Sequence, residues 1–202
     1  LYAVTDTHWL NGKSLAHDVE CALKGGASCI QLREKHADES ELCAHALEIQ
    51  ALCKQYAVPF IINDNVALAK RICADGVHLG QSDMPATQAR TLLGSRAIIG
   101  VSAHSVQEAV RAQHDGADYL GAGAVFSTST KTNTTALPLQ ILKDICNAVT
   151  IPVVAIGGIS AHNASQLAGC GISGIAVVSA IFASTDIQAA TRTMRSIAHN
   201  LL

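Results

Sequence analysis

Two aspartates stand where short apolar segments end, and together they could bind a hard cation. Asp64 ends PFIIND at 59–64, and Asp83 follows GVHLG at 76–80. On neighbouring parallel strands, both carboxylates would reach one end of the sheet and could bind magnesium with phosphate oxygens and water. Each alone has a simpler explanation, Asp64 as a helix N-cap and Asp83 as a turn residue before Pro85. Because both occur at adjacent strand ends, we predict the metal.

Three basic side chains occupy comparable positions in a chain that has only 14 lysines and arginines. Arg33 and Lys35 belong to the segment QLREK, and Lys131 ends the run T-x-T-K. Alternation along an extended chain puts Gln31, Arg33 and Lys35 on one face. Lys35 could simply be a solvated surface residue. Together the three cations would neutralise a diphosphate leaving group.

Small residues follow two later apolar segments and indicate a phosphate site. Gly157 and Gly158 end IPVVAIGG, and Val178 and Ser179 end GIAVVS. Many parallel barrels bind phosphate at this position with backbone N–H groups and a helix N-terminus. Either segment alone could be a tight turn that needs a positive φ. Because both carry the pattern, we predict that they bind phosphate.

Two histidines lie near strand ends, and we expect neither to act as an acid or a base. His78 is flanked by Val77 and Leu79, which favours a hydrogen-bonded interior residue. His104 stands where the next helix starts. Chemistry at this end of the sheet is therefore expected to depend on cations and hydrogen bonds.

Eight short apolar segments alternate with amphipathic ones, which predicts strands and helices in turn. The expected strands cover residues 1–6, 28–34, 59–64, 76–80, 97–102, 118–126, 151–158 and 174–179. The expected helices start near Ser14, Glu39, Val66, Thr87, Val106, Leu139, Asn163 and Ile187. Such apolar strands in strict alternation favour a closed parallel barrel, an α/β fold of the (β/α)₈ TIM-barrel type, over a doubly wound sheet. The strand ends above would then meet at its mouth, near the long irregular segment 127–138, which we expect to be functional or mobile.

Length and composition limit the remaining possibilities. The 202 residues are 49% hydrophobic and 15% charged, enough apolar material for one domain over 1–202. A formal net charge of −2 provides no basic field for nucleic acid or membrane binding, and a homo-oligomer is left open. Seven cysteines without a C-x-x-C pair indicate reduced, buried thiols. With no leader or membrane-spanning segment expected, these features predict a cytoplasmic protein.

The motifs occur in an order that resembles the thiamine-phosphate synthase family. QLREK, IIND, GVHLGQSD, GVSAHS, T-x-T-K, AIGGI and VVSAI follow one another over nearly the whole chain. AIGGI-like phrases are common in phosphate-binding barrels, whereas QLREK, IIND, GQSD and T-x-T-K together are specific. The resemblance implies a transferase of thiamine biosynthesis. It would join hydroxymethylpyrimidine diphosphate to thiazole phosphate with Mg²⁺ and release pyrophosphate.

The resemblance also implies roles for individual residues. Magnesium would be held by Asp64 and Asp83, and Arg33, Lys35, Ser102 and Lys131 would be catalytic. The pyrimidine diphosphate would contact Gln31, Leu32, Arg33, Glu34, Lys35, Asn63, Ser102 and Lys131. The thiazole phosphate would contact Thr128, Ser129, Thr130, Gly158, Val178 and Ser179. One departure from the family pattern is TNTTALPL after Lys131, which lacks the glycine often found before the next helix.

Other functions of the same fold would require different residues. A thiazole tautomerase resembles the synthases but tends to lose the metal carboxylates and to place a histidine in the sixth strand segment. Here that segment is GAGAVF, with Ala124 near the histidine position. A regulatory barrel would bind thiazole phosphate without turnover, and other phosphate-sugar enzymes would need an inward acid/base pair that the sequence does not provide. Retention of the metal and diphosphate residues favours the synthase.

Overall fold

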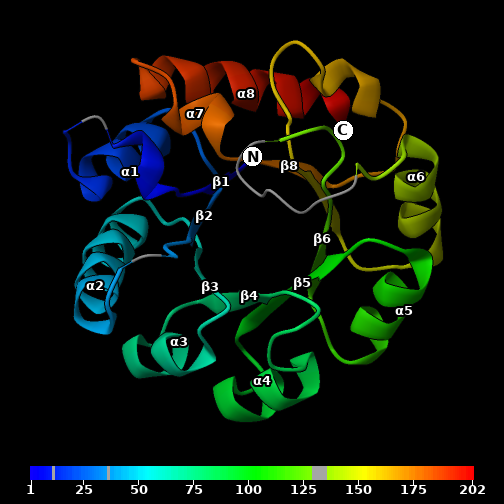
Figure 1. Ribbon diagram of the computed structural model, residues 1–202, viewed down its shortest axis with the longest axis horizontal. Coiled ribbons are helices and arrows are strands. Elements are labelled where there is room, and N and C mark those ends of the chain that lie inside the picture. Colours follow the sequence, from blue (N-terminus) through cyan, green and yellow to red (C-terminus); the bar gives the residue numbers. More distant parts are fainter. Residues whose placement is uncertain (11, 36, 129–135) are drawn as a thin grey trace.

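A closed barrel of parallel strands forms the centre of the computed structural model, which describes residues 1–10, 12–35, 37–128 and 136–202. Each strand pairs with the next in sequence, and β8 pairs with β1 to close the ring (Figure 1). The strands are β1 (Tyr2–Val4), β2 (Cys29–Leu32), β3 (Phe60–Asn63), β4 (Gly76–Leu79), β5 (Ile98–Ala103), β6 (Tyr119–Gly123), β7 (Val153–Ile156) and β8 (Gly174–Val177). The predicted (β/α)₈ barrel is confirmed, and the doubly wound sheet is excluded.

Helices surround the barrel and connect its strands (Figure 1). They are α1 (Leu15–Lys24), α2 (Glu39–Gln55), α3 (Val66–Ile72), α4 (Ala86–Leu93), α5 (Val106–His114), α6 (Leu139–Ala148), α7 (Ser179–Phe182) and α8 (Ile187–Leu201). Side chains just before several of them accept backbone N–H groups of the first turn. Ser14, Asp38, Ser105 and Asp186 do so at α1, α2, α5 and α8. These caps explain why the helices begin where the sequence predicted.

One expected helix is replaced by shorter structure. The segment near Asn163 forms the 3₁₀ helix η2 (Ala164–Leu167), and α7 directly after β8 was not expected. Gly169 and Gly171, both with positive φ, follow η2 at once and end the helical turn early. Asn163 is used in the loop before it, because its side chain donates to the carbonyl of Gly158 at 2.8 Å. The expectation of a full helix here was wrong.

The hydrophobic core has two parts, outside and inside the strands. The larger part fills the space between barrel and helices and includes the fully buried Ile62, Leu79 and Ile99. Burial of each such side chain contributes about 1.5–3 kcal/mol. The smaller part lies inside the barrel around Tyr2 and Ile61. The barrel interior is therefore only partly filled by aliphatic side chains, and polar groups occupy the rest.

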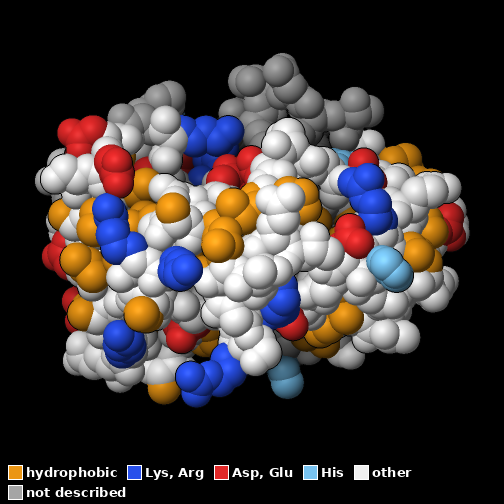
Figure 2. Space-filling model, turned by 90° about the horizontal axis from the view of Figure 1, so that it is seen from below, with side chains coloured by type: hydrophobic (Ala, Val, Ile, Leu, Met, Phe, Trp, Pro, Cys, Tyr) orange, Lys and Arg blue, Asp and Glu red, His pale blue; other side chains and the backbone are white. Residues whose placement is uncertain are grey.

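Positive and negative side chains are mixed on the face in Figure 2, as expected, whereas the burial of the cysteines differs from expectation. Figure 2 shows one side of the molecule, on which basic side chains are interspersed with acidic ones. All seven cysteines are free, but Cys53 and Cys170 alone are buried and Cys73 is exposed at the end of α3. The prediction that all thiols are buried was wrong. In the described part of the chain, no helix has the length and apolar character needed to cross a membrane.

Candidate active site

A pocket of about 1000 Å³, counted with its open mouth, extends into the barrel at the carboxyl ends of the strands. Most of the sequence-predicted site residues that the structure describes line its wall. They are Gln31, Arg33, Asn63, Ser102, Thr128, Gly158, Val178 and Ser179. Side chains from β1, β7 and β8, including Val4, Ile156 and Ala176, give the wall an apolar part. The pocket opens at the strand ends, which is where parallel barrels bind their ligands.

Alternation along β2 decides which residues of QLREK face this pocket. Gln31 and Arg33 line it, whereas Leu32 is buried against the helices and Glu34 turns to α2. Arg33 is anchored twice, since its backbone N–H donates to Thr5 Oγ1 at 2.9 Å and its guanidinium lies 3.8 Å from the Asp6 carboxylate. The predicted contacts of Leu32 and Glu34 with the diphosphate are not supported, because Leu32 points to the helices and Glu34 contacts α2, and neither lines the pocket.

Glu34 has a different partner at the rim of the barrel. Its side chain is 1% exposed, and its Oε2 lies 2.9 Å from His45 Nδ1 of α2, within hydrogen-bond distance. The other oxygen, Oε1, is buried without a hydrogen bond. The contact ties the chain after β2 to α2 and so helps to hold Arg33 in place. Lys35, one residue further, is exposed and does not line the pocket, so alternation does not extend to it.

A row of polar side chains crosses the floor of the pocket. Gln31 Nε2 donates to Tyr2 Oη at 2.8 Å, and Tyr2 Oη lies 2.8 Å from Tyr119 Oη. Tyr119 Oη is 2.9 Å from His78 Nδ1, and His78 Nε2 is 3.0 Å from Ser102 Oγ. Burial raises the pKa of both tyrosines, so their hydroxyls stay protonated at neutral pH. As predicted, His78 is a hydrogen-bonded interior residue.

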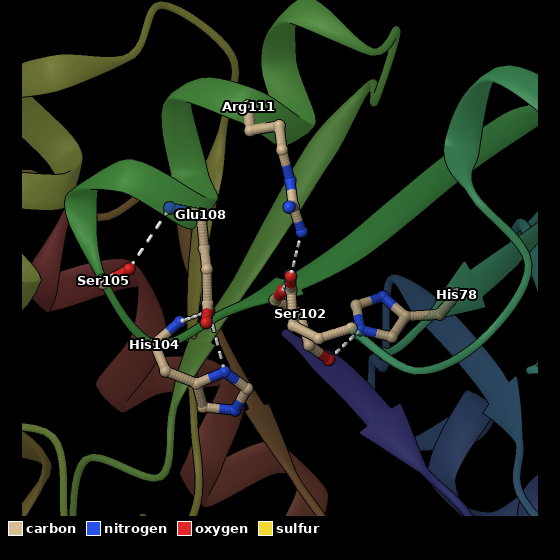
Figure 3. Close-up of polar contacts among 7 residues, drawn as sticks. His78, Ser102, His104, Ser105, Glu108 and Arg111 are labelled. Atoms are coloured by element: carbon tan, nitrogen blue, oxygen red, sulfur yellow. Dashed lines mark hydrogen bonds and ion pairs between the residues drawn. The ribbon is translucent and has the colours of Figure 1, made fainter.

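The backbone of Ser102 is held from the other side. Gln81, in the turn after β4, donates from Nε2 to the Ser102 carbonyl at 2.6 Å, and its Oε1 accepts from Arg111 of α5 at 2.7 Å. Figure 3 shows Ser102 between His78 and the contacts that lead to Arg111. His104 lies beside this group and bonds to Glu108 through its backbone N–H and its Nδ1. Ser102 is thus fixed at both side chain and backbone.

Asp64 and Asp83 follow the neighbouring strands β3 and β4, as predicted, but their surroundings differ. Asp64 has φ +60°, and its Oδ2 accepts from the Asn63 side chain at 2.6 Å. Asp83 Oδ2 accepts from the backbone N–H of Gly80 at 2.6 Å, and Asp83 lines a second pocket that shares no lining residue with the main one. Asn65, rather than Asp64, is the N-cap of α3. The cap explanation for Asp64 is therefore wrong, whereas the turn explanation for Asp83 is partly correct.

Asp64 and Asp83 offer oxygen donors of the kind that a magnesium ion prefers. Two carboxylates at the ends of adjacent strands provide the hard oxygen ligands that magnesium prefers. Among the described residues, no group of three or more His, Cys, Asp or Glu side chains could hold a metal alone. Magnesium commonly keeps several waters and binds through one or two carboxylates plus substrate phosphates. By donor type the two carboxylates suit an ion that a diphosphate would complete, although neither of them is among the residues that line the main pocket.

The two predicted phosphate loops meet at the opposite rim of the pocket. Gly157 and Gly158 have φ values of +100° and +64°, and a Cβ at Gly158 would lie 2.4 Å from the Ser127 carbonyl oxygen. Only glycine allows the loops after β6 and β7 to approach so closely. Val178 and Ser179 follow β8 at the start of α7. These loops and Thr128 form one side of the pocket, as a phosphate site requires.

Three predicted site residues lie outside the described part of the chain, namely Ser129, Thr130 and Lys131. The sequence reasoning missed the floor residues Tyr2 and Tyr119 and the support from Gln81. Tyr119 follows Gly116–Asp118 at the start of a strand and resembles an ordinary strand residue. A usable signal was the pair of glycines in neighbouring strands, because Gly100 and Gly121 leave room for the rings of Tyr119 and His78.

The barrel and its pocket define a class, the parallel (β/α)₈ barrels that carry their active sites at the carboxyl ends of the strands. Within that class, the family model for thiamine monophosphate synthase matches residues 1–181. The chain belongs to this family. The thiamine-phosphate synthase of Ruminiclostridium cellulolyticum is 48% identical, over 98% of this chain and 94% of that protein. That of Methanobrevibacter smithii is 47% identical, over 96% and 92%.

A solved structure supports the same assignment. The thiamine phosphate pyrophosphorylase from Pyrococcus furiosus superimposes with a TM-score of 0.90 and is 39% identical. The alignment covers 100% of this chain and 96% of that one. Agreement therefore extends over the whole barrel, including the strand ends that carry the pocket residues.

Proposed function

We propose that this protein joins hydroxymethylpyrimidine diphosphate to thiazole phosphate and releases thiamine phosphate and pyrophosphate. One observation carries the proposal: a single pocket is lined both by the residues expected for the pyrimidine diphosphate and by those expected for the thiazole phosphate. The first group includes Gln31, Arg33, Asn63 and Ser102, and the second Thr128, Gly158, Val178 and Ser179. The names of the relatives at 47–48% identity support the same reaction.

In the proposed reaction, the bond from the pyrimidine methylene carbon to the diphosphate oxygen breaks, and a bond from that carbon to the thiazole nitrogen forms. The nitrogen lone pair supplies the electrons, so no base and no enzyme nucleophile is required. Arg33 of the pocket wall would bind the diphosphate, and Lys131 together with Lys35, which is exposed outside that wall, would add positive charge. Ser102, Asn63 and Gln31 would orient the pyrimidine. The loops at Gly158 and Ser179 would hold the thiazole phosphate so that its ring faces the carbon.

Asp64 and Asp83 would hold a magnesium ion, which when bound neutralises negative charge on the diphosphate. The chain itself provides the surroundings for the carbon under attack. Val4, Ile156 and Ala176 line the pocket with aliphatic groups that do not react with a carbocation and that exclude water. Where the family's tautomerases place a histidine, Ala124 carries no acid or base, and it packs 2.4 Å from where a Cβ at Gly157 would lie.

We extend the proposal to organisation and location. Residues 1–202 act as one catalytic domain, which the pairing of β1 with β8 supports because both ends of the chain contribute to the barrel. The protein works in the cytoplasm, where the free state of its cysteines is maintained. No role is assigned to nucleic acid or to a membrane.

The deciding experiment incubates the purified protein with both substrates and magnesium and measures thiamine phosphate and pyrophosphate. We expect the two products in equal amounts, and none when either substrate is omitted. Release of phosphate-free products, or conversion of the thiazole phosphate alone to an isomer, would reject the synthase in favour of another reaction of the fold.

A further inference from the structure

The polar row on the pocket floor has a direction that the chemistry of its members determines. The side-chain amide nitrogen of Gln31, Nε2, can donate hydrogen bonds but cannot accept them, so it donates to Tyr2 Oη. The hydroxyl proton of Tyr2 then needs an acceptor. Tyr119 Oη at 2.8 Å is a stronger acceptor than the neighbouring Cys29 thiol. Tyr119 in turn must donate, and its partner on that side is His78 Nδ1 at 2.9 Å.

The protonation of His78 follows from this direction. A neutral imidazole whose Nδ1 accepts a hydrogen bond carries its proton on Nε2. Nε2 lies 3.0 Å from Ser102 Oγ, so His78 donates to the serine oxygen. The serine keeps its own hydroxyl proton, and Ser102 lines the pocket. The row therefore ends in one hydrogen-bond donor that faces the ligand.

The barrel provides the space that this row needs. A Cβ at Gly100 would lie 2.1 Å from the Tyr119 ring, and a Cβ at Gly121 would lie 2.9 Å from the His78 ring. Two neighbouring strands thus carry glycine where the rings pass, although glycine weakens strands. The tyrosines lose solvation on burial but each finds hydrogen-bond partners, which limits the cost. The arrangement is built into the barrel and is not an incidental surface contact.

From this geometry we propose that Tyr2, Tyr119 and His78 are positioning residues for the pyrimidine half of the reaction, acting through Ser102. They hold the Ser102 hydroxyl so that it donates to an acceptor atom of the pyrimidine, a ring nitrogen and not the amino group. This inference rests on the proposed function, because it takes the pyrimidine as the ligand beside Ser102. It assigns no contact with substrate to the two tyrosines.

The first test removes one hydroxyl from the middle of the row. Tyr119→Phe should lower kcat/KM for the pyrimidine diphosphate about tenfold or more while leaving KM for thiazole phosphate within about twofold. Tyr56→Phe is the matched control, since its hydroxyl contacts Glu20 on the helical surface, and it should behave as wild type. An equal rise in KM for both substrates, or an unchanged kcat/KM for the pyrimidine diphosphate, would overturn the proposal.

A double-mutant cycle tests whether the effect passes through Ser102. If it does, adding Tyr119→Phe to Ser102→Ala should cause little further loss, within about twofold. Two independent losses that multiply would show that Tyr119 acts by another route and would overturn the proposal. Melting temperatures of all variants are compared so that a general loss of folding is recognised; Tyr2→Phe, one step further from the serine, repeats the test if Tyr119→Phe unfolds.

The tautomer of His78 is a separate readout that needs no substrate. Nitrogen-15 NMR of the ligand-free protein, with the signal assigned by its loss in His78→Gln, should show Nε2 protonated and Nδ1 accepting. A proton on Nδ1 would reverse the row and overturn the donor assignment. Absence of thiamine phosphate formation by wild type would reject the proposed function alone, so the two failures are distinguishable.

Discussion

Asn65 Oδ1 accepts the backbone N–H of Leu68 at 2.9 Å, which makes Asn65 the N-cap of α3. The helix therefore does not need the preceding carboxylate. Asp64 adopts a left-handed backbone conformation, which aspartate tolerates better than most residues and which is often found at functional sites. Of these two adjacent polar residues, Asn65 has the structural role of capping α3, and Asp64 has the role that we assign to metal binding.

This separation gives the first prediction. Asp64→Asn should lower turnover by a factor of about 10² or more at fixed magnesium and raise the magnesium concentration needed for half-maximal rate. Asn65→Ala should cost about 1 kcal/mol of folding free energy with much less effect on the magnesium dependence. Magnesium titrations of initial rate and urea unfolding measure the two effects. Full wild-type activity in excess chelator would remove the magnesium assignment.

Asp83 needs a milder test, because its Oδ2 also accepts the Gly80 N–H at 2.6 Å. Asp83→Asn retains an acceptor for this hydrogen bond but removes the charge. We expect a weaker response to magnesium with the folding free energy changed by about 0.5 kcal/mol or less. Asp83→Ala should lose both the charge and the acceptor for the Gly80 N–H, and its folding free energy should fall by a further amount of about 1–3 kcal/mol. Equal magnesium dependence in wild type and Asp83→Asn would place the ion elsewhere.

The opposite rim of the pocket is tested with added charge. Ser179→Asp would place a carboxylate against the thiazole phosphate and should abolish its binding while the pyrimidine diphosphate still binds. Thr185→Asp is the control, because Thr185 is exposed between α7 and α8 and adds the same charge outside the pocket. Lys131→Ala should have the opposite effect: it should weaken binding of the pyrimidine diphosphate and leave binding of the thiazole phosphate unchanged. Calorimetric titration of each substrate separates these outcomes; unchanged thiazole phosphate binding by Ser179→Asp would reject the site.

Gly158 offers a matched comparison with another glycine of positive φ. Alanine at Gly158 would put a Cβ 2.4 Å from the Ser127 carbonyl, whereas at Gly116 nothing lies within 4 Å. Both variants should lose about 1 kcal/mol through backbone strain. Only Gly158→Ala should also separate the loops after β6 and β7 and weaken thiazole phosphate binding by about tenfold or more. Equal binding by the two variants would show that close approach of these loops is not needed.

Much of the architecture was predictable because the signals are local. Periodicity and capping residues such as Ser105 and Asp186 mark where helices begin, and each acts within one turn. The pocket could be anticipated because strand ends of a parallel barrel meet at one mouth. The short η2 was not predicted, since the side chain of Asn163 bonds to Gly158 in the loop and two glycines follow.

The floor of the site could not be predicted for a different reason. Tyr2 and Tyr119 are 117 positions apart, and only closure of the barrel brings their hydroxyls together. The segment around Tyr2 does not distinguish an inward polar tyrosine from a core aromatic, and for Tyr119 the glycines at 100 and 121 are an indirect signal. Lys35 shows the opposite error, since alternation was extended to a residue three positions beyond the end of β2, where the chain is no longer a strand.

Two thiols that are largely removed from water, those of Cys29 and Cys53, give the folded protein a defined response to high pH. Burial raises the pKa of Cys29 and of Cys53 to about 12. A group whose pKa is higher in the folded state contributes its full stability below its unfolded pKa and loses it as pH rises toward the folded value. The free energy of unfolding should therefore fall from about pH 9 upward. Cys53→Ala should lower stability at pH 7 but reduce this slope, as urea titrations at pH 7–10 will show; a steeper slope would contradict the assignment.

The last prediction concerns how the carbon–oxygen bond breaks. The carbon under attack is attached to an aminopyrimidine ring, whose amino lone pair can delocalise positive charge, and the described pocket wall places no cysteine beside it. Departure of the diphosphate can therefore precede formation of the carbon–nitrogen bond. Arg33 would stabilise the charge that develops on the leaving group, and the aliphatic wall would keep water from the cation.

A substituent on the pyrimidine distinguishes this order from direct displacement. A strongly electron-withdrawing group should slow the chemical step by about 10² or more while changing binding little, because it destabilises the cation. In a direct displacement the same group would have a small or accelerating effect. Single-turnover rates with saturating thiazole phosphate exclude product release from the comparison, and a dissociation constant for each diphosphate controls for binding. Near-equal rates for the substituted and natural diphosphates would show that nitrogen attacks before the diphosphate has left.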